Sequence, residues 1–96
     1  QSKISIGNYL LNLNSRQISK NKDVLNLTEK ETELMLFIMT KKFVTLKDLQ
    51  KKVWKHSFEL ETHTVETHIY RLRKKFLEKF KDHEFIKHDK RGYYLN

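Results

Sequence analysis

The sequence of 96 residues predicts an α+β fold with a small N-terminal antiparallel sheet, three helices and a C-terminal hairpin. Three observations predict it. Apolar and polar residues alternate with the period of a strand over residues 1–27, and the apolar spacing becomes helical after Thr28. Two apolar runs then flank a polar turn with a glycine near the C-terminus. A chain of this length holds one modest core, so we expect a single domain over 1–96.

The first 27 residues carry short alternating runs that are separated by turn-forming residues. The apolar positions are Ile4, Ile6, Tyr9, Leu11, Leu13, Ile18, Val24, Leu25 and Leu27. Breaks at 7–8, 14–15 and 21–23 consist of Gly, Asn, Ser, Lys and Asp, which favour turns. The pattern therefore predicts three or four short antiparallel strands.

Two helix starts follow the predicted sheet. Residues 28–31, Thr-Glu-Lys-Glu, have the capping-box spacing, in which the hydroxyl and the carboxylate satisfy exposed helix N–H groups reciprocally. A helix is therefore expected over about 29–42. Thr45 and Asp48 have a similar spacing and predict a second, short helix that ends near Trp54.

The third predicted helix follows a stretch without periodicity. Val65, Ile69, Leu72 and Phe76 recur at i, i+4, i+7 and i+11, which places them on one stripe facing the core. At about 100° per residue, the opposite face carries a polar set. That set consists of His63, Thr67, Tyr70, Arg71 and Lys74. We expect a three-helix bundle over 28–81 and a terminal hairpin over 84–96.

The charge balance favours a polyanionic partner. Twenty basic against twelve acidic side chains give a net charge of +8. Between residues 71 and 81 only Glu78 opposes a run of basic residues. These are Arg71, Arg73, Lys74, Lys75, Lys79 and Lys81. A basic helix is also compatible with an ordinary solvated surface, so charge alone does not decide the function.

The third helix has the two faces that a DNA-reading helix needs, an apolar anchor and an outer row of donors and methyl groups. Arg71 can bond guanine O6 and N7 bidentately, and Thr67 can offer a hydroxyl or press its methyl group against thymine. Phosphates can be neutralised by Arg73, Lys74 and Lys75.

Enzymatic, metal and membrane classes lack support in the sequence. Cysteine is absent, and there is no glycine-rich phosphate loop, Gly-x-Ser-x-Gly or His-Glu-x-x-His motif. His63 and His68 lie about 140° apart on a helix and cannot share a metal from one face. The longest apolar run, residues 34–39, is too short for a membrane span. We expect a cytoplasmic protein that is not an enzyme and needs no cofactor.

Several motifs occur in a fixed order from Leu27 onward. They are Leu27-Thr28 with Glu31 and Leu34, then Leu49 with Val53-Trp54, then residues 64–76 (Thr-Val-Glu-Thr-His-Ile-Tyr-Arg-Leu-Arg-Lys-Lys-Phe), and finally Gly92-Tyr93-Tyr94-Leu95. In these motifs the chain resembles the effector domain of the OmpR/PhoB family of bacterial response regulators, a winged helix-turn-helix. The strands before Leu27 resemble that family's N-terminal sheet.

The resemblance implies sequence-specific binding to double-stranded DNA, with a recognition helix over about 63–77 in the major groove. The implied base contacts are Thr64, Thr67 and Arg71, and the implied backbone contacts are Trp54, His63, Tyr70, Arg73, Lys74 and Lys75. Tyr70 departs from the basic residue common there and would make a neutral bond. Trp54 has a second interpretation, an indole packed against the third helix.

The hairpin would be the wing, with Lys90 or Arg91 reaching a minor groove; simple solvation of both is an equal alternative. This segment departs most from the family, since it has a single glycine and Asp89 where a basic residue is expected. The loop over 55–61 would face RNA polymerase, through Lys55, His56, Phe58, Glu59 and Leu60. Phe58 and Leu60 are equally compatible with closing the core beneath the loop.

The resemblance further implies a monomeric isolated domain that binds direct-repeat half-sites as a head-to-tail dimer. The phosphoacceptor receiver domain of such regulators has no place in this chain. Two other functions compete with DNA reading: a winged helix used to dock an acidic protein, and a nonspecific nucleic-acid binder.

Overall fold

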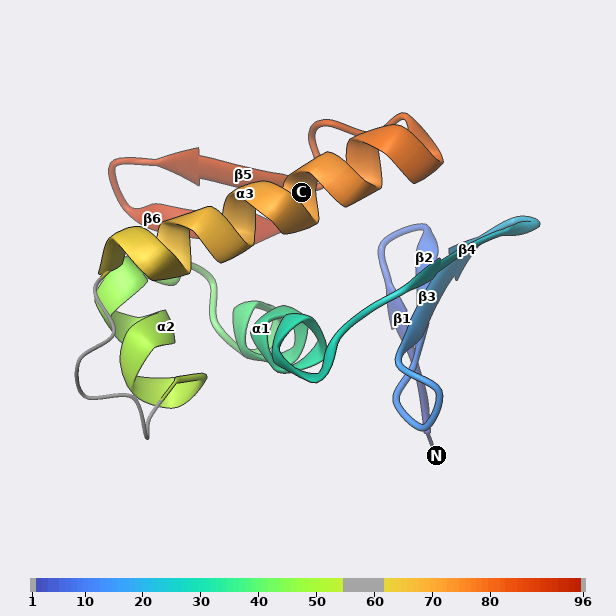
Figure 1. Cartoon of the computed structure of the whole chain (residues 1–96), viewed down its shortest axis with the longest axis horizontal. Coiled ribbons are helices and arrows are strands. Elements are labelled where there is room, and N and C mark those ends of the chain that lie inside the picture. Colours follow the sequence, from blue (N-terminus) through green and yellow to red (C-terminus); the bar gives the residue numbers. More distant parts are fainter. Residues whose placement is uncertain (1, 55–61, 96) are drawn as a thin grey trace.

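The computed structural model describes residues 2–54 and 62–95 and has the predicted order of sheet, three helices and hairpin (Figure 1). Helix α3 runs along one side of the molecule, with the hairpin behind it and α1 and α2 beneath it in this view. The N-terminal sheet lies at the end of the molecule opposite α2. The predicted winged-helix architecture is confirmed.

The N-terminal sheet has four strands in the order β1-β2-β3-β4, all antiparallel. Their bounds are β1 Lys3–Ile6, β2 Tyr9–Asn12, β3 Gln17–Lys20 and β4 Asp23–Asn26. Leu11 and Ile18 are opposite each other and fully buried, so the alternation in the sequence correctly predicted the inner face. The connecting turns use left-handed backbone at Gly7, Arg16 and Asn21.

Both predicted capping boxes form. Helix α1 spans Glu29–Thr40, with Thr28 Oγ1 accepting from the Glu31 N–H at 3.1 Å and Glu31 Oε1 accepting from the Thr28 N–H at 2.9 Å. Helix α2 spans Leu46–Lys52 and begins with the same reciprocal bonds between Thr45 and Asp48. Each helix ends two residues before the limit that periodicity suggested.

Helix α3 spans Thr62–Phe80, and the hairpin consists of β5 Ile86–Asp89 and β6 Gly92–Leu95. Val44, in the stretch between α1 and α2, pairs with Tyr93 of β6 in a single antiparallel bridge. There the Val44 N–H donates to the Tyr93 carbonyl at 2.9 Å, and the Tyr93 N–H donates to the Val44 carbonyl at 2.7 Å. The hairpin is thereby fixed to the helical part of the domain.

Gly92 is needed where this contact is made. Its φ of 125° lies in a region that L side chains rarely adopt, and a Cβ atom there would stand 2.5 Å from the Val44 carbonyl oxygen. Glycine therefore allows the hairpin to approach the backbone at Val44.

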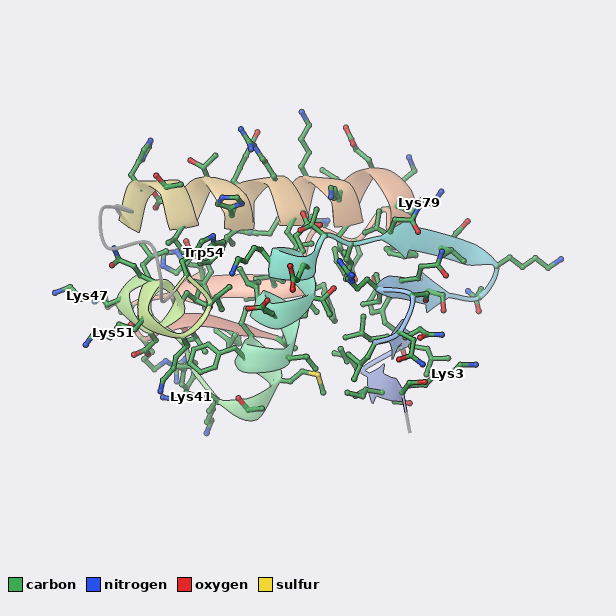
Figure 2. The ribbon with its side chains drawn as sticks, turned by 60° about the horizontal axis from the view of Figure 1, so that its bottom comes forward. Lys3, Lys41, Lys47, Lys51, Trp54 and Lys79 are labelled. Atoms are coloured by element: carbon green, nitrogen blue, oxygen red, sulfur yellow. The ribbon has the colours of Figure 1, made fainter. Side chains whose placement is uncertain are left out.

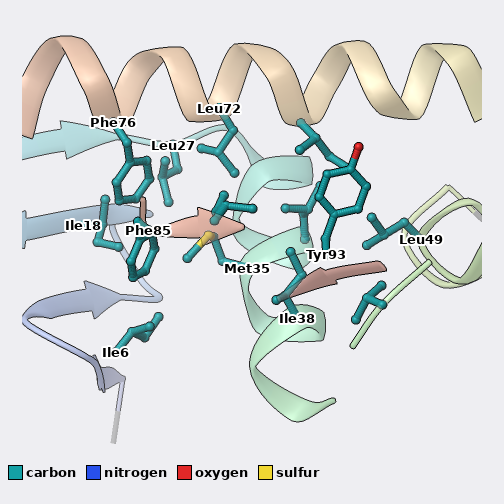
Figure 3. Packing of buried hydrophobic residues seen from close by; sticks show 14 of the residues in the cluster. Ile6, Ile18, Leu27, Met35, Ile38, Leu49, Leu72, Phe76, Phe85 and Tyr93 are labelled. Carbon is teal, nitrogen blue, oxygen red and sulfur yellow. The ribbon is translucent and has the colours of Figure 1, made fainter. Parts of the chain in front are cut away.

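One hydrophobic core joins all the elements (Figure 3). The predicted stripe of α3, Val65, Ile69, Leu72 and Phe76, is buried to 1% exposure or less. Phe76 stacks on Phe85 with ring centroids 4.8 Å apart, and Tyr9 packs against both rings. The aromatic cluster thus holds the sheet, the end of α3 and the start of the hairpin together.

Within the described residues, no helix is long and apolar enough to cross a membrane.

Candidate nucleic-acid interface

Within the described part of the chain, no other element covers the outer face of α3. In Figure 2 the helix lies along the upper edge of the molecule, and side chains from its upper side point away from every other element. With 19 residues the helix is about 28 Å long. A rigid helix that is anchored on one side and free on the other has the shape that enters a major groove.

This outer face carries the polar side chains that periodicity predicted. His63, Tyr70, Arg71 and Lys74 are exposed, and Thr64 and Thr67 are half-buried. Among the described residues, neither Arg71 nor Lys74 has an ion-pair partner, and both residues are exposed. The Thr67 hydroxyl donates to the His63 carbonyl at 3.0 Å, so its proton is already used.

A groove of about 410 Å³ separates α3 from the hairpin. Its lining residues are Glu66, Thr67, Ile69, Tyr70, Arg73, His88 and Tyr93. Burial raises the pKa of the Tyr93 hydroxyl and the carboxylate of Glu66 raises it further, while Arg73 opposes them. The predicted phosphate ligand Arg73 therefore lies on the wing side of α3, next to an acidic neighbour.

The other side of α3 faces the rest of the helical bundle, and two predicted backbone contacts, Lys75 on α3 and Trp54 after α2, lie on this side. Lys75 Nζ donates to Glu31 Oε1 at 2.8 Å, which binds the ammonium group to α1. Trp54 is only 7% exposed and packs against the ring of His68 on α3, with centroids 4.9 Å apart. For Trp54 the packed alternative therefore describes the structure, and Lys75 is engaged within the protein.

The wing turn consists of Lys90 and Arg91, between β5 and β6. Lys90 is exposed and has no ion pair within the described part of the chain. Arg91 pairs with Asp89, with 2.7 Å between Nη2 and Oδ2. Of the two residues predicted to reach the minor groove, Lys90 is therefore unpaired within the described residues and Arg91 is bound to Asp89.

A second groove, also about 410 Å³, lies between the start of α2 and the wing. Lys47 and Lys90 line it from its two sides, with His88 between this groove and the first. Figure 2 places Lys47 near Lys51, on the α2 side of the molecule. Sequence reasoning missed Lys47 and His88. Lys47 could have been identified as a candidate phosphate contact from its position in the first turn of α2, the helix that precedes α3.

The loop residues Lys55, His56, Phe58, Glu59 and Leu60 lie outside the described part of the chain. Among the described residues, no three His, Asp or Glu side chains are grouped so that they could hold a metal ion.

Comparison with known proteins identifies the family. The model of the family "Transcriptional regulatory protein, C terminal" matches residues 21–95. The heme response regulator HssR of Staphylococcus epidermidis is 32% identical over 76 residues, which are 77% of this chain and 34% of HssR. The chain spans about a third of the length of such relatives.

Solved structures agree with this assignment. The DNA-binding domain of E. coli CadC is 29% identical and superposes with a TM-score of 0.86, over all of this chain and 92% of the other. The DNA-binding domain of the response regulator AdeR, solved in complex with an intercistronic region, is 23% identical with a TM-score of 0.81 over 97% of this chain and 98% of the other, and it shares the fold. The chain belongs to the family of C-terminal DNA-binding domains of OmpR/PhoB-type transcriptional regulators.

Proposed function

We propose that the domain reads a short DNA half-site by placing the first half of α3 in the major groove, with Thr64, Thr67 and Arg71 as base contacts. The observation that carries this assignment is the exposed guanidinium of Arg71, which lies midway along α3 and has no ion-pair partner among the described residues. Because the Thr67 hydroxyl already donates to His63, its methyl group is the part best placed to contact thymine.

Phosphate contacts come from the margins of the same face. His63, Tyr70, Arg73 and Lys74 flank the base-reading residues, and Tyr70 would donate a neutral hydroxyl bond. Lys75 and Trp54 belong to the support of α3, because one is bonded to Glu31 and the other is buried against His68. Lys47 joins the phosphate set from α2, the helix that precedes the reading helix.

The hairpin acts as the wing, with Lys90 as its exposed cation at the minor groove, where narrow A·T-rich segments have enhanced negative potential. Lys47 and Lys90 line one groove from two elements, which suits a single DNA strand passing between them. The wing and α3 then contact neighbouring grooves of one duplex.

In the intact regulator we propose that two domains bind head to tail on direct repeats, and that residues 55–61 meet RNA polymerase. The relatives named as response regulators support an effector role for this domain. The solved complex of the AdeR domain with an intercistronic region supports duplex DNA as the ligand. The site of action would be the cytoplasm, where chromosomal DNA is found.

Selection from a random duplex library, followed by titration of the selected duplex, tests the proposal. Specific DNA reading predicts an enriched motif, affinity at least about 10³-fold above random DNA, and a steep log–log dependence on salt. Equal affinity for the selected duplex, random DNA and double-stranded RNA would favour a nonspecific binder. Failure to bind any duplex, with binding to acidic protein segments, would favour a docking module.

A further inference from the structure

The wing turn contains an ion pair between residues two apart. Asp89 ends β5, and its Oδ1 accepts a hydrogen bond from the Arg91 N–H at 2.8 Å. Its Oδ2 accepts from Nη2 of Arg91 at 2.7 Å, and Oδ1 also receives the Nε–H at 3.4 Å. One carboxylate thus shapes the turn and holds the guanidinium.

An aromatic ring also contacts the same guanidinium. Cζ of Arg91 lies 4.1 Å from the centroid of the Phe43 ring. Phe43 packs edge-on against Tyr94 of β6, with centroids 5.2 Å apart, and it precedes Val44, which is bonded to Tyr93. The ring is therefore fixed to the hairpin, and Arg91 is held by both a carboxylate and an aromatic face.

The electrostatics of the turn follow from these contacts. The hydrogen bonds from the Arg91 side chain and backbone keep the pKa of the Asp89 carboxyl below its usual range, so the pair is charged on both sides at neutral pH and sums to zero. Lys90 has no such partner in the described structure and remains the net positive charge of the turn. The Arg91 side chain is nevertheless 64% exposed, so a competing anion can reach it.

We infer that Asp89 keeps the Arg91 guanidinium from binding DNA, so that the wing contacts the duplex through Lys90. The domain then binds DNA more weakly than it would if both Lys90 and Arg91 bound phosphates. This inference rests on the proposed function. Asp89 occupies the Nε–H and one Nη2–H of the guanidinium, so a phosphate that binds bidentately through these two nitrogens must displace the carboxylate. A phosphate that binds through the remaining N–H groups meets a guanidinium whose charge Asp89 already neutralises. Asp89 is accordingly a positioning residue that limits affinity.

A double-mutant cycle on a selected duplex tests this inference. Asp89→Asn removes the charge but keeps an oxygen that can accept from the Arg91 N–H, so the turn is preserved. We expect Asp89→Asn to raise the affinity about three- to tenfold and to steepen the salt slope by about 1, as one more phosphate becomes neutralised. Arg91→Ala alone leaves Asp89 as an unpaired negative charge near the phosphates, so it should lower the affinity about two- to fourfold. The double variant has the same net charge in the turn as the wild type and should return to the wild-type affinity and slope.

Two outcomes would overturn the inference while leaving the proposed function intact. An affinity of the double variant about tenfold below that of the wild type, with a shallower salt slope, would show that Arg91 already binds DNA, because Asp89 repels nothing in that variant. An equal gain from Asp89→Asn with and without Arg91 would show that Asp89 acts only by repelling phosphates. If Asp89→Asn unfolds, Asp89→Ser takes its place in the cycle, because serine also keeps a side-chain oxygen that can accept from the Arg91 N–H.

Lys74→Ala separates failure of the inference from failure of the proposed function. If the domain reads DNA with α3, Lys74→Ala weakens binding to every duplex and reduces the slope, whatever the wing variants do. Wild-type affinity for Lys74→Ala, together with weak and salt-independent binding by the wild type, would overturn both proposals. Thermal melts of all four cycle members and of Lys74→Ala confirm that each is folded.

Discussion

Lys75 on α3 donates a hydrogen bond to Glu31 on α1, with 2.8 Å between Nζ and Oε1. The same carboxylate oxygen accepts from the Thr28 N–H in the capping box, so one acceptor joins the start of α1 to the recognition helix. The Glu31 side chain is 9% exposed. Removing the ammonium group would therefore leave a nearly buried carboxylate without its cation.

Substitutions of the adjacent residues Lys75 and Lys74 on α3 should have separate effects on folding stability and on DNA binding. We expect Lys75→Met to lower the free energy of unfolding by about 1–2 kcal/mol, because a mostly buried carboxylate loses a charged partner. The salt slope of DNA binding should stay close to that of the wild type. Urea denaturation and a salt titration of DNA affinity measure the two effects.

Lys74→Met is the matched control, one residue away on the same helix. It should change the unfolding free energy by less than about 0.5 kcal/mol, as expected for an exposed side chain without a partner. It should also weaken DNA binding and reduce the salt slope by about 1. The opposite pattern, with stability lost at Lys74 and phosphate binding lost at Lys75, would contradict the assignment of the two residues.

Gly92 should be among the least replaceable residues of the hairpin. Gly92→Ala would place a methyl group against the Val44 carbonyl and force an alanine into an unfavourable backbone region. We expect a loss of about 2–4 kcal/mol in unfolding free energy from the clash and the strain together. Urea denaturation measures the loss.

Gly7→Ala provides the comparison for Gly92. Its φ is also positive, at 59°, but no atom lies within 4 Å of the added Cβ. Its cost should be limited to backbone strain, about 1 kcal/mol. Equal costs at the two glycines would show that the contact with Val44 is not what requires glycine in the wing.

Tyr9 and Asp82 should contribute stability that depends on pH. The Tyr9 hydroxyl donates to Asp82 Oδ2 at 2.6 Å and joins the sheet to the end of α3. Burial raises the pKa of the Asp82 carboxyl, but the hydrogen bonds from Tyr9 and from the Glu84 N–H outweigh it and hold the pKa below its usual value. A carboxyl whose pKa is depressed by folding adds stability above its unfolded pKa, which is lost as the pH falls through the folded pKa.

We therefore expect Tyr9→Phe to cost about 1–2 kcal/mol at pH 7, where the bond is made to a carboxylate. The difference from the wild type should shrink as the pH falls below about 4, since the unfolded aspartate titrates near 3.9. Thermal or urea denaturation between pH 3 and pH 7 gives this comparison. A difference that stays constant over this range would mean that the bond does not depend on the charge of Asp82.

The sequence predicted features that depend on neighbours along the chain. The capping residues Thr28 and Thr45 and the stripe from Val65 to Phe76 are local patterns, and the structure confirms each of them. The outward position of Arg71 follows from the same helical period. These predictions succeeded because a helix or a strand fixes the relative direction of nearby side chains whatever packs against it.

Features that depend on long-range contacts were not predictable in this way. Lys75 shares the basic character of Lys74, and only its contact with a residue 44 positions earlier shows that it is already engaged. The indole of Trp54 was equally compatible with DNA and with the core until its contact with His68 was known. In the wing, Phe43 meets Arg91 because Val44 pairs with β6, and no sequence period encodes that pairing.

The base-reading role of Arg71 is the central claim, and a specificity measurement on one variant tests it most directly. Affinities of the wild type and Arg71→Ala are measured for the selected duplex and for its single-base-pair substitutions. We predict that Arg71→Ala loses about 1–3 kcal/mol of discrimination at one G·C pair and keeps its preferences elsewhere. An equal loss of affinity on cognate and random duplexes, with discrimination unchanged at every position, would contradict the account.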